Sequence, residues 1–485
     1  MFRLVRELTG HSFAAFVAGV VYVFSPGHII SYGWTNLWGV QWFPFALLYA
    51  VRLLRVGRPW HGIALALTMT LATLTDWHQP ALLLLTITVL TLAVVCGRRQ
   101  SGFVRAGMLQ RLLWSCLAYS LLVSPLALLV LKELAVGDTL LKTSSWFKQH
   151  ELLGYRTHFG DVIAHGVLLG WMSLALAMYG VVRGLDFWMK CFAAMLAAFA
   201  VLSLGEGLRL PGGAEPVIPL PFLLWRKLPL LGIMRGSLYF GLMVQVCVAI
   251  LAGHGVKRLW ERLDGWQPRQ VPRVQLALGI GLLALILAET LQAPLAPVPV
   301  RFHPVYEAIQ YDGKEGVILD APIGYTREST PHHAGWSMYL QTLHNKPLVG
   351  GYTQFDGRQR LAFLDQNPVL KLFTDRSTPQ PENIPDGVDE LRAFLTQYHV
   401  RWIILRKGMR DPACDLQRIP GWSTQKLMTL LAPAVLNGTL QTMWHPPPYC
   451  GDWDTAKAQQ ADVLVRRTVG QPVWDDDELV AYQVR

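Results

Sequence analysis

The stretch LGEGLRLPGGAEPVIPLPFLLWRKLPLLGIMRGSLYFGLMVQVCVAILAGHGVKRLW, residues Leu204 to Trp260, decides the fold of this chain. It begins with a proline-rich loop and ends with an apolar run, Leu238 to Val256, which is followed by Lys257 and Arg258. A helix of that length crosses a bilayer, and the basic residues after it mark the cytoplasmic side. The loop before it therefore faces outward. Its prolines do not suit a helix or a sheet interior, so we predict an irregular segment that lines a cavity at the membrane surface.

The composition indicates the same class of protein. Hydrophobic residues make up 52% of the 485 positions, charged residues only 16%, and there are 18 tryptophans. This is too apolar for an ordinary soluble protein of this size and predicts a multi-pass membrane protein. The net charge of +10 comes from Lys and Arg in short loops between apolar runs, where the positive-inside rule expects them, so we do not expect nucleic-acid binding.

Nine apolar runs are candidate membrane spans. They lie near His11 to Phe24, Leu37 to Leu54, His61 to Thr75, Gln79 to Cys96, Leu112 to Leu131, Val162 to Val182, Phe187 to Leu204, Leu238 to Val256 and Val274 to Leu291. Basic loops fall at every second boundary between them, so one orientation satisfies all of them. It places the N-terminus in the cytoplasm and everything after about Leu291 outside. No cleavable signal peptide is evident.

Residues 1–297 therefore form a transmembrane helical domain, and residues 298–485 form a small extracytoplasmic domain. Gly316 to Asp320 and Arg401 to Leu405 are predicted strands, Asp389 to Tyr398 a helix, and Leu479 to Val484 a closing strand. This pattern indicates an α/β or α+β module of normal domain size. In an oxidising compartment its two cysteines, Cys414 and Cys450, are candidates for a disulfide, and the alternative is two unrelated thiols.

Four stretches together resemble a group of bacterial multi-pass membrane proteins similar to C-type glycosyltransferases. The stretches are Ala14 to Arg55, Ile218 to Val256, Tyr339 to Tyr352 (YLQTLHNKPLVGGY) and Tyr398 to Leu405 (YHVRWIIL). The resemblance implies a protein of the plasma membrane and cell envelope that transfers a hexose or pentose from a polyprenyl-phosphate donor to an acceptor on the outer face. It also implies a C-terminal extracytoplasmic domain.

The chain departs from this group at its beginning. Such proteins usually start with a span and a large outer loop whose acidic residue serves as base or metal ligand, whereas MFRLVRELTGHS resembles the segment that follows. A catalytic chain would therefore need that loop from upstream sequence or from a partner chain.

Inverting sugar transfer needs a carboxylate to deprotonate the acceptor. The best remaining carboxylate is Asp76, which lies with Trp77 and His78 in a very short outer turn, and Asp76 and His78 are the candidate catalytic residues. The alternative is a helix-ending aspartate beside a tryptophan of the interfacial belt. Glu206, Asp161 and Glu289 lie near outer span ends as secondary acidic candidates, Glu289 more as a packing partner.

Transfer also needs cations, or a divalent metal, to stabilise the departing phosphate. Arg235 precedes a span on the outer side, against the positive-inside tendency, and a guanidinium there suits a lipid phosphate. The alternative is an arginine that extends to lipid headgroups. Arg226 and Lys227 share the argument more weakly. His332, His333 and the later His344 lack the spacing and supporting carboxylates of a metal site, so we assign no metal ligands.

In the outer domain, the segment WSMYLQTLHNKPLVGGY offers a polar and aromatic surface for a sugar. Its candidate binding residues are Tyr339, Gln341, His344 and Tyr352. The alternative is a strand–turn element that docks this domain on the membrane part.

Three functions remain open at this point. The first is a glycosyltransferase, and the second is a non-catalytic membrane scaffold that binds a partner or completes such an enzyme. The third is a transporter, against which the absence of an inverted repeat argues.

Overall fold

The computed structural model describes residues 1–25, 39–97, 102–135, 157–158, 169–205, 207–209, 217–227, 237–264, 271–290, 302–323, 331–349, 368–373, 387–407 and 455–484. Contacts divide the chain into two compact units. The first is built from the apolar helices that end at Thr290, and the second from the elements that begin at Pro304. The predicted boundary between residues 297 and 298 lies outside the described residues.

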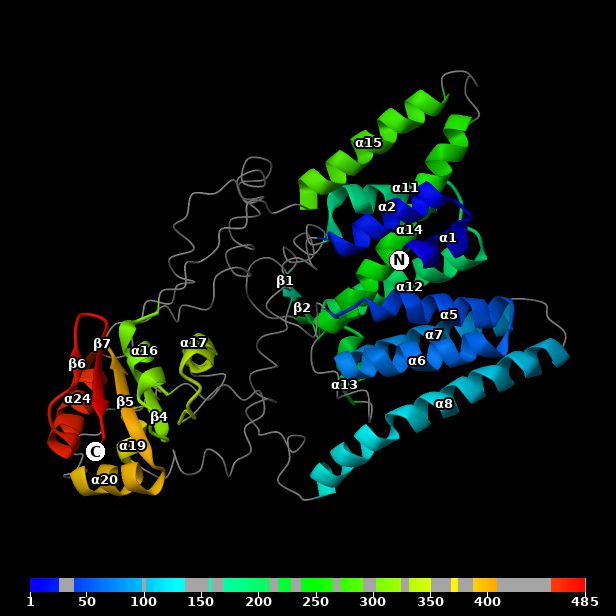
Figure 1. Ribbon diagram of the computed structural model, residues 1–485. Helices are drawn as coiled ribbons and strands as arrows, with labels where there is room; N and C mark the ends of the chain where they lie inside the picture. The colour runs from blue at the N-terminus through cyan, green and yellow to red at the C-terminus, as the bar shows by residue number, and fades with distance from the viewer. Residues whose placement is uncertain are drawn as a thin grey trace. The chain divides into compact units, whose positions relative to one another are not determined.

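The first unit is helical (Figure 1). Each of the nine predicted apolar runs contains a helix. The helices are α1 (Phe2–Thr9), α2 (Ser12–Val23), α5 (Trp42–Arg55), α6 (Pro59–Thr75), α7 (His78–Gly97), α8 (Gly102–Ala135), α11 (Trp171–Val182), α12 (Phe187–Ser203), α13 (Phe222–Lys227), α14 (Leu238–Asp264) and α15 (Val271–Thr290).

The described residues support three of the nine predicted spans. Among the described residues, three helical segments are long and apolar enough to cross a membrane: His78–Gly97, Gly107–Leu129 and Tyr239–Asp264. Length is the physical reason, because helices of 12 to 14 residues such as α2, α5 and α11 reach only about 18 to 21 Å, against about 30 Å of hydrocarbon.

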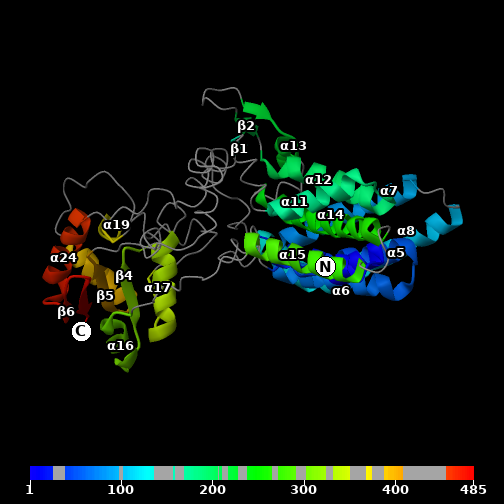
Figure 2. The same ribbon diagram turned by 90° about the horizontal axis from the view of Figure 1, so that it is seen from above.

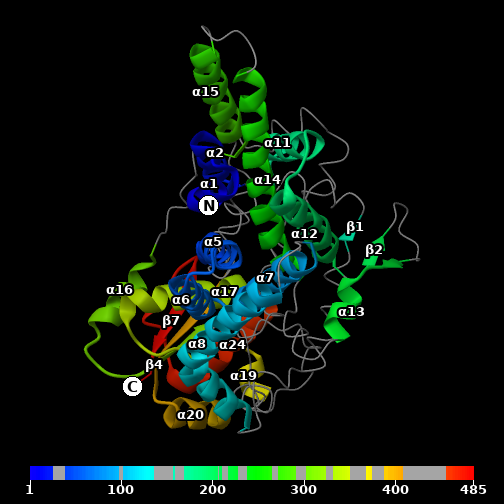
Figure 3. The ribbon, with the colours of Figure 1, turned by 90° about the vertical axis from the view of Figure 1, so that its right-hand side faces the viewer.

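Helix α14 lies at the centre of this unit and packs against α2, α11 and α12 (Figure 3). Small residues allow the close approach. A Cβ atom added at Gly253 would lie 3.0 Å from the Ala18 Cβ, and one added at Gly255 would lie 2.0 Å from the Leu176 carbonyl oxygen. Glycine at such contacts brings helix backbones together, which is how apolar helices associate where lipid removes the hydrophobic driving force.

Basic side chains at the end of α5 contact two other helices. Arg52 pairs with Glu7 of α1 at 2.8 Å. Arg55 lies with its guanidinium carbon 4.9 Å from the ring centroid of Trp188, in the first turn of α12. We refer to this end of α5 as the basic end of the unit. Which side of the membrane it faces stays a prediction.

The proline-rich stretch is more regular than predicted. It contains β2 (Gly207–Arg209) and β3 (Val217–Pro219), which pair antiparallel, and β2 also pairs with β1 (Thr157–His158) in the order β1-β2-β3. Helix α13 follows. Pro219 is tolerated because it ends β3, an edge strand, where a missing N–H breaks no ladder.

The second unit is built on a four-stranded sheet in the order β4-β5-β7-β6. Its strands are β4 (Val317–Ala321), β5 (Val400–Arg406), β6 (Trp474–Asp475) and β7 (Leu479–Gln483), and its helices are α16 (Pro304–Tyr311), α17 (Pro331–His344), α19 (Pro368–Lys371), α20 (Val388–Gln397) and α24 (Thr455–Val469). Strands β4 and β5 are parallel, and the other pairs are antiparallel. The three predicted strands and the predicted helix are therefore confirmed, and the module combines a mixed sheet with helices.

Helices cover both faces of this sheet (Figure 2). Ile318, Trp402 and Ile404 form one core with α16 and α17. Leu319 and Ile403, which point the other way, pack with α19, α20 and α24. The alternation follows from the two-residue period of a strand, and it places every second residue of β4 and β5 in the α16–α17 layer.

The strand–turn prediction for the segment Trp336 to Tyr352 is wrong for its first half, which belongs to α17. Ser337, Leu340 and His344 are buried, and their spacing of three and four residues follows the helical period rather than the strand period. The chain leaves the helix at Asn345, with a φ of 55°, and Leu348 then bridges to Ile318 beside β4.

Candidate functional site

Asp76 connects two helices at one end of the first unit. Its backbone N–H donates to the Ala72 carbonyl and ends α6. Its Oδ1 accepts a hydrogen bond of 2.6 Å from the backbone N–H of His78, where α7 begins. Asp76 is buried, with 9% exposed surface. The predicted turn is thus a corner in which one residue ends α6 through its backbone N–H and accepts at the start of α7 through its carboxylate.

The same Asp76 oxygen holds the imidazole of His78. The distance from Oδ1 to Nδ1 is 2.7 Å. A carboxylate only accepts, so Nδ1 carries the proton and Nε2 of the neutral ring keeps its lone pair. Asp76 therefore orients His78, and His78 is the group with a basic nitrogen to offer. The sequence did not indicate this contact between the two side chains.

The second contact of the His78 ring is with the ring of Tyr239. The two rings stack with centroids 4.0 Å apart and planes at 13°. Tyr239 belongs to the first turn of α14, so the contact joins α7 to the central helix. A quarter of the His78 side chain remains exposed. Sequence reasoning missed Tyr239, and its position directly after the proline-rich stretch was the one signal available.

Further hydrogen bonds make this end of the unit polar. The Trp42 Nε1 donates to the Thr75 hydroxyl at 3.1 Å, and the wholly buried Gln79 donates to the Gly39 carbonyl at 3.0 Å. The Tyr22 hydroxyl donates to the Val40 carbonyl at 2.8 Å. These bonds hold the ends of α2, α5, α6 and α7 together around the corner at Asp76.

The structure places one of the predicted cationic segments at this end. Phe222 of α13 contacts Phe240 of α14 edge to face at 6.0 Å, one residue from Tyr239. Arg226 and Lys227 belong to the same short helix, and their side chains are not among those described. Arg235 lies outside the described residues, as do Asp161 and Glu206.

Glu289 has a capping role. Its carboxylate accepts the backbone N–H of Trp171, and that of Met172 at 3.0 Å, in the first turn of α11. Four N–H groups at a helix N-terminus lack partners within the helix, and a carboxylate satisfies them well. The expectation of a packing partner is therefore confirmed over that of a catalyst.

The candidate sugar-binding residues of the second unit do not share one surface. Tyr339 is exposed on α17, whereas His344 is buried with 3% exposed surface. Gln341 donates its amide to the Lys346 carbonyl at 3.1 Å. Tyr352 lies outside the described residues, as do Cys414 and Cys450.

His344 is part of the core of the second unit. Its Nδ1 accepts the Lys346 backbone N–H at 3.1 Å, and its ring stacks near Tyr306 with centroids 6.2 Å apart. Burial lowers the pKa of His344 to about 4, against a raising effect of Asp320. The side chain is therefore neutral at physiological pH and has a structural position.

A buried ion pair was not predicted. Asp320, at the end of β4, accepts from the guanidinium of Arg406, at the end of β5, with one distance of 3.0 Å. The Tyr306 and Ser337 hydroxyls each lie 3.2 Å from the same guanidinium. Burial alone would lower the pKa of Arg406, but Asp320 and Tyr306 outweigh it and raise that pKa. The guanidinium of Arg406 thus finds hydrogen-bond partners in Asp320, Tyr306 and Ser337. The cluster connects β4 and β5 to α16 and α17.

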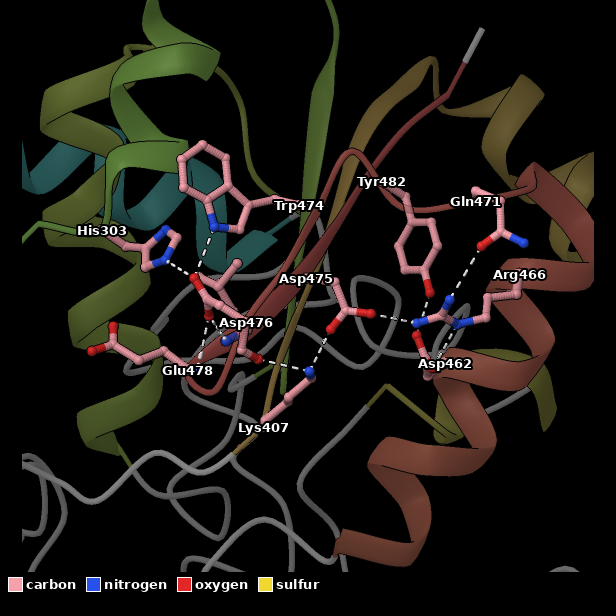
Figure 4. Close-up of polar contacts among 11 residues, drawn as sticks. His303, Lys407, Asp462, Arg466, Gln471, Trp474, Asp475, Asp476, Glu478 and Tyr482 are labelled. Atoms are coloured by element: carbon pink, nitrogen blue, oxygen red, sulfur yellow. Dashed lines mark hydrogen bonds and ion pairs between the residues drawn. The ribbon is translucent and has the colours of Figure 1, made fainter.

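A second polar network lies at the opposite sheet edge (Figure 4). Asp476, in the turn between β6 and β7, accepts from His303 at 2.7 Å and from the Trp474 indole at 2.8 Å. Burial would raise the pKa of Asp476, but these bonds and backbone N–H groups lower it well below its usual range. Arg466 of α24 joins Asp462 and Asp475 at 2.8 and 2.7 Å. These contacts fasten the hairpin to α16 and α24.

Within the described part of the chain, no group of three or more His, Cys, Asp or Glu side chains is placed to hold a metal ion. Comparison with known proteins adds no assignment, because no protein-family model and no curated protein matches the chain.

Proposed function

We propose that this protein is a membrane glycosyltransferase that moves a sugar from a polyprenyl-phosphate donor to an acceptor at the outer face of the membrane. The observation that carries the proposal is the pair formed by Asp76 and His78, with 2.7 Å between Oδ1 and Nδ1. A histidine whose one nitrogen is held by a buried carboxylate is the usual arrangement of a general base and the group that orients it.

Three apolar helices long enough to span a bilayer support the membrane location. Helix α8 exposes Leu113, Trp114 and Leu121, as a helix in contact with lipid does. We further propose that the shorter apolar helices also lie in the bilayer, with the basic end of the unit in the cytoplasm and the Asp76 end outside.

The proposed reaction proceeds by inversion in one displacement. His78 Nε2 takes the proton of the acceptor hydroxyl, whose oxygen attacks the anomeric carbon. The bond from that carbon to the phosphate oxygen breaks, and polyprenyl phosphate leaves with the bonding electrons. Arg226, Lys227 and Arg235 are the cations assigned to the developing phosphate charge. Asp76 stabilises the imidazolium that forms.

Release of polyprenyl phosphate tests this proposal. The full-length protein in nanodiscs is incubated with tritiated polyprenyl-phosphate hexoses and pentoses and with a membrane extract as the acceptor source. Loss of a general base lowers turnover by about 10²- to 10⁴-fold, which is the effect expected for His78→Gln. Asp76→Asn should lower turnover as well, because an amide can present its NH₂ to Nδ1 and favour the wrong tautomer.

Trp77→Phe is the matched control, because Trp77 lies in the same turn and is exposed. Wild-type rates in both the His78 and the Asp76 variants, with Trp77→Phe also active, would refute the assignment. Hydrogen exchange in α6 and α7 separates lost chemistry from lost folding.

The second candidate is a non-catalytic membrane scaffold that binds a partner chain or completes such an enzyme. One observation favours it. In the second unit, Asp320 binds Arg406, and His344 binds the backbone of the same unit. These buried polar side chains therefore have structural partners within the unit. Detectable release of polyprenyl phosphate by this chain alone would rule out the scaffold.

A further inference from the structure

We propose that the outer face of α17 in the second unit lies on the bilayer surface, with Phe302, Met338 and Tyr339 in the lipid headgroup region. We refer to these three residues as the aromatic patch. The inference does not depend on the proposed catalysis, because a scaffold with the same fold would present the same face.

The aromatic patch is exposed and ordered. Phe302 is 39% exposed, Met338 41% and Tyr339 44%. The rings of Phe302 and Tyr339 stack with centroids 5.8 Å apart and planes at 16°, so the patch presents a continuous apolar surface from two separate segments. Tyrosine combines an apolar ring with a polar tip, which is the combination enriched where lipid meets water.

The distribution of charge distinguishes this side of the sheet from the other. Helix α17, PHHAGWSMYLQTLH, contains no Asp, Glu, Lys or Arg. Helices α20 and α24 pack on the opposite face of the sheet. Helix α20 carries Asp389, Glu390 and Arg392, and α24 carries Asp462, Arg466 and Arg467. A surface helix that faces water normally carries charged residues. Helix α17, in contrast to α16 with its exposed Glu307, is therefore the part of this side that suits an environment less polar than water.

The covalent chain keeps the aromatic patch near the membrane. Helix α15 is apolar from Val274 to Glu289 and ends at Thr290. The next described residue is Phe302, itself a member of the patch. Fully extended, the chain between Thr290 and Phe302 spans at most about 40 Å. A linker of this length allows the aromatic patch to reach the surface of the bilayer.

Lipid is a better occupant than a charged protein surface or a polyanion. The three described side chains of the patch carry no charge, and the polar group they present is the Tyr339 hydroxyl. Its contact with lipid should therefore depend on burial of apolar surface rather than on anionic headgroups.

Photo-crosslinking in the full-length protein tests the proposal. The photoreactive amino acid p-benzoylphenylalanine replaces Tyr339 in one variant and Phe302 in a second, each reconstituted in nanodiscs of phosphatidylethanolamine and phosphatidylglycerol. Irradiation followed by intact-mass analysis should detect adducts that carry the mass of one phospholipid. The yield should be the same when phosphatidylglycerol is replaced by neutral phosphatidylcholine.

Val463 and Val473 are matched control positions, because they are 57% and 59% exposed and lie in α24 and next to β6. The same replacement there should give several times less lipid adduct. Adducts to protein instead of lipid at Tyr339 and Phe302, or lipid adducts equal to those at the two control positions, would overturn the proposal. Because two patch positions are tested separately, failure of one variant to fold leaves the other to decide.

Discussion

Replacing Gly255 by alanine should disrupt the contact between α11 and α14. The new Cβ atom would lie 2.0 Å from the carbonyl oxygen of Leu176 and 2.9 Å from its carbon. Real Cβ atoms essentially never come within 3.0 Å of a heavy atom that lies outside their own residue and its two chain neighbours. The obstacle is backbone, which cannot rotate away as a side chain can, so the two helices must separate by about 1 Å or more.

Two opposed effects set the change in the free energy of unfolding. Alanine favours a helix over glycine by about 1 kcal/mol, and forced overpacking of a core costs about 1–3 kcal/mol. Gly241→Ala, in the same helix, supplies the first effect alone, because no atom lies within 4 Å of its added Cβ. The free energies of unfolding of these two variants should therefore differ by about 1–3 kcal/mol, with Gly255→Ala the less stable.

Unfolding of the full-length protein by SDS in mixed micelles, followed by loss of helical circular dichroism, measures this difference. Gly241→Ala should be at least as stable as the wild type, and Gly255→Ala should unfold at a lower SDS fraction. Equal stability of the two variants would refute the close α11–α14 contact.

Two other predictions concern single side chains. Between pH 6.5 and about 4 the unfolded chain binds a proton on His344 that the folded chain excludes, so the second unit should lose up to about 3 kcal/mol as the pH falls through this range. Hydrogen exchange in β5 at pH 7 and 5 should reveal this loss; His344→Met should abolish it, and His399→Asn, at an exposed histidine, should retain it. Glu289→Gln should weaken the α11 N-terminus by about 1 kcal/mol, seen as faster exchange of the Trp171 and Met172 amides, and unchanged exchange there would contradict the capping role.

Local sequence patterns were sufficient where one short segment carries its own signal. β-branched and aromatic residues between turn residues predicted β4 at Gly316 to Asp320 and β5 at Arg401 to Leu405. Apolar runs likewise predicted the positions of the helices of the first unit other than α1 and α13. The strand–turn prediction for α17 was wrong because Ser337, Leu340 and His344 have the three- and four-residue spacing of a helix.

The candidate site was likewise predicted only in part. The sequence singled out Asp76 and His78 because a carboxylate and an imidazole in a very short turn between apolar runs are unusual. It assigned the base to Asp76, and the structure instead makes Asp76 the group that orients His78, since Oδ1 is occupied by two donors from that residue. No local pattern indicates which of two neighbouring polar groups will accept from the other.

The sequence by itself determined that the chain is apolar and helical over its first three-fifths and α/β over the rest, because hydropathy and periodicity are properties of consecutive residues. Only the tertiary structure decided that Tyr239 stacks on His78, that Arg406 binds Asp320, and that Gly255 meets the backbone of α11. The physical reason is that these contacts join residues far apart along the chain, and their geometry is set by how whole helices and strands pack rather than by the residues beside them.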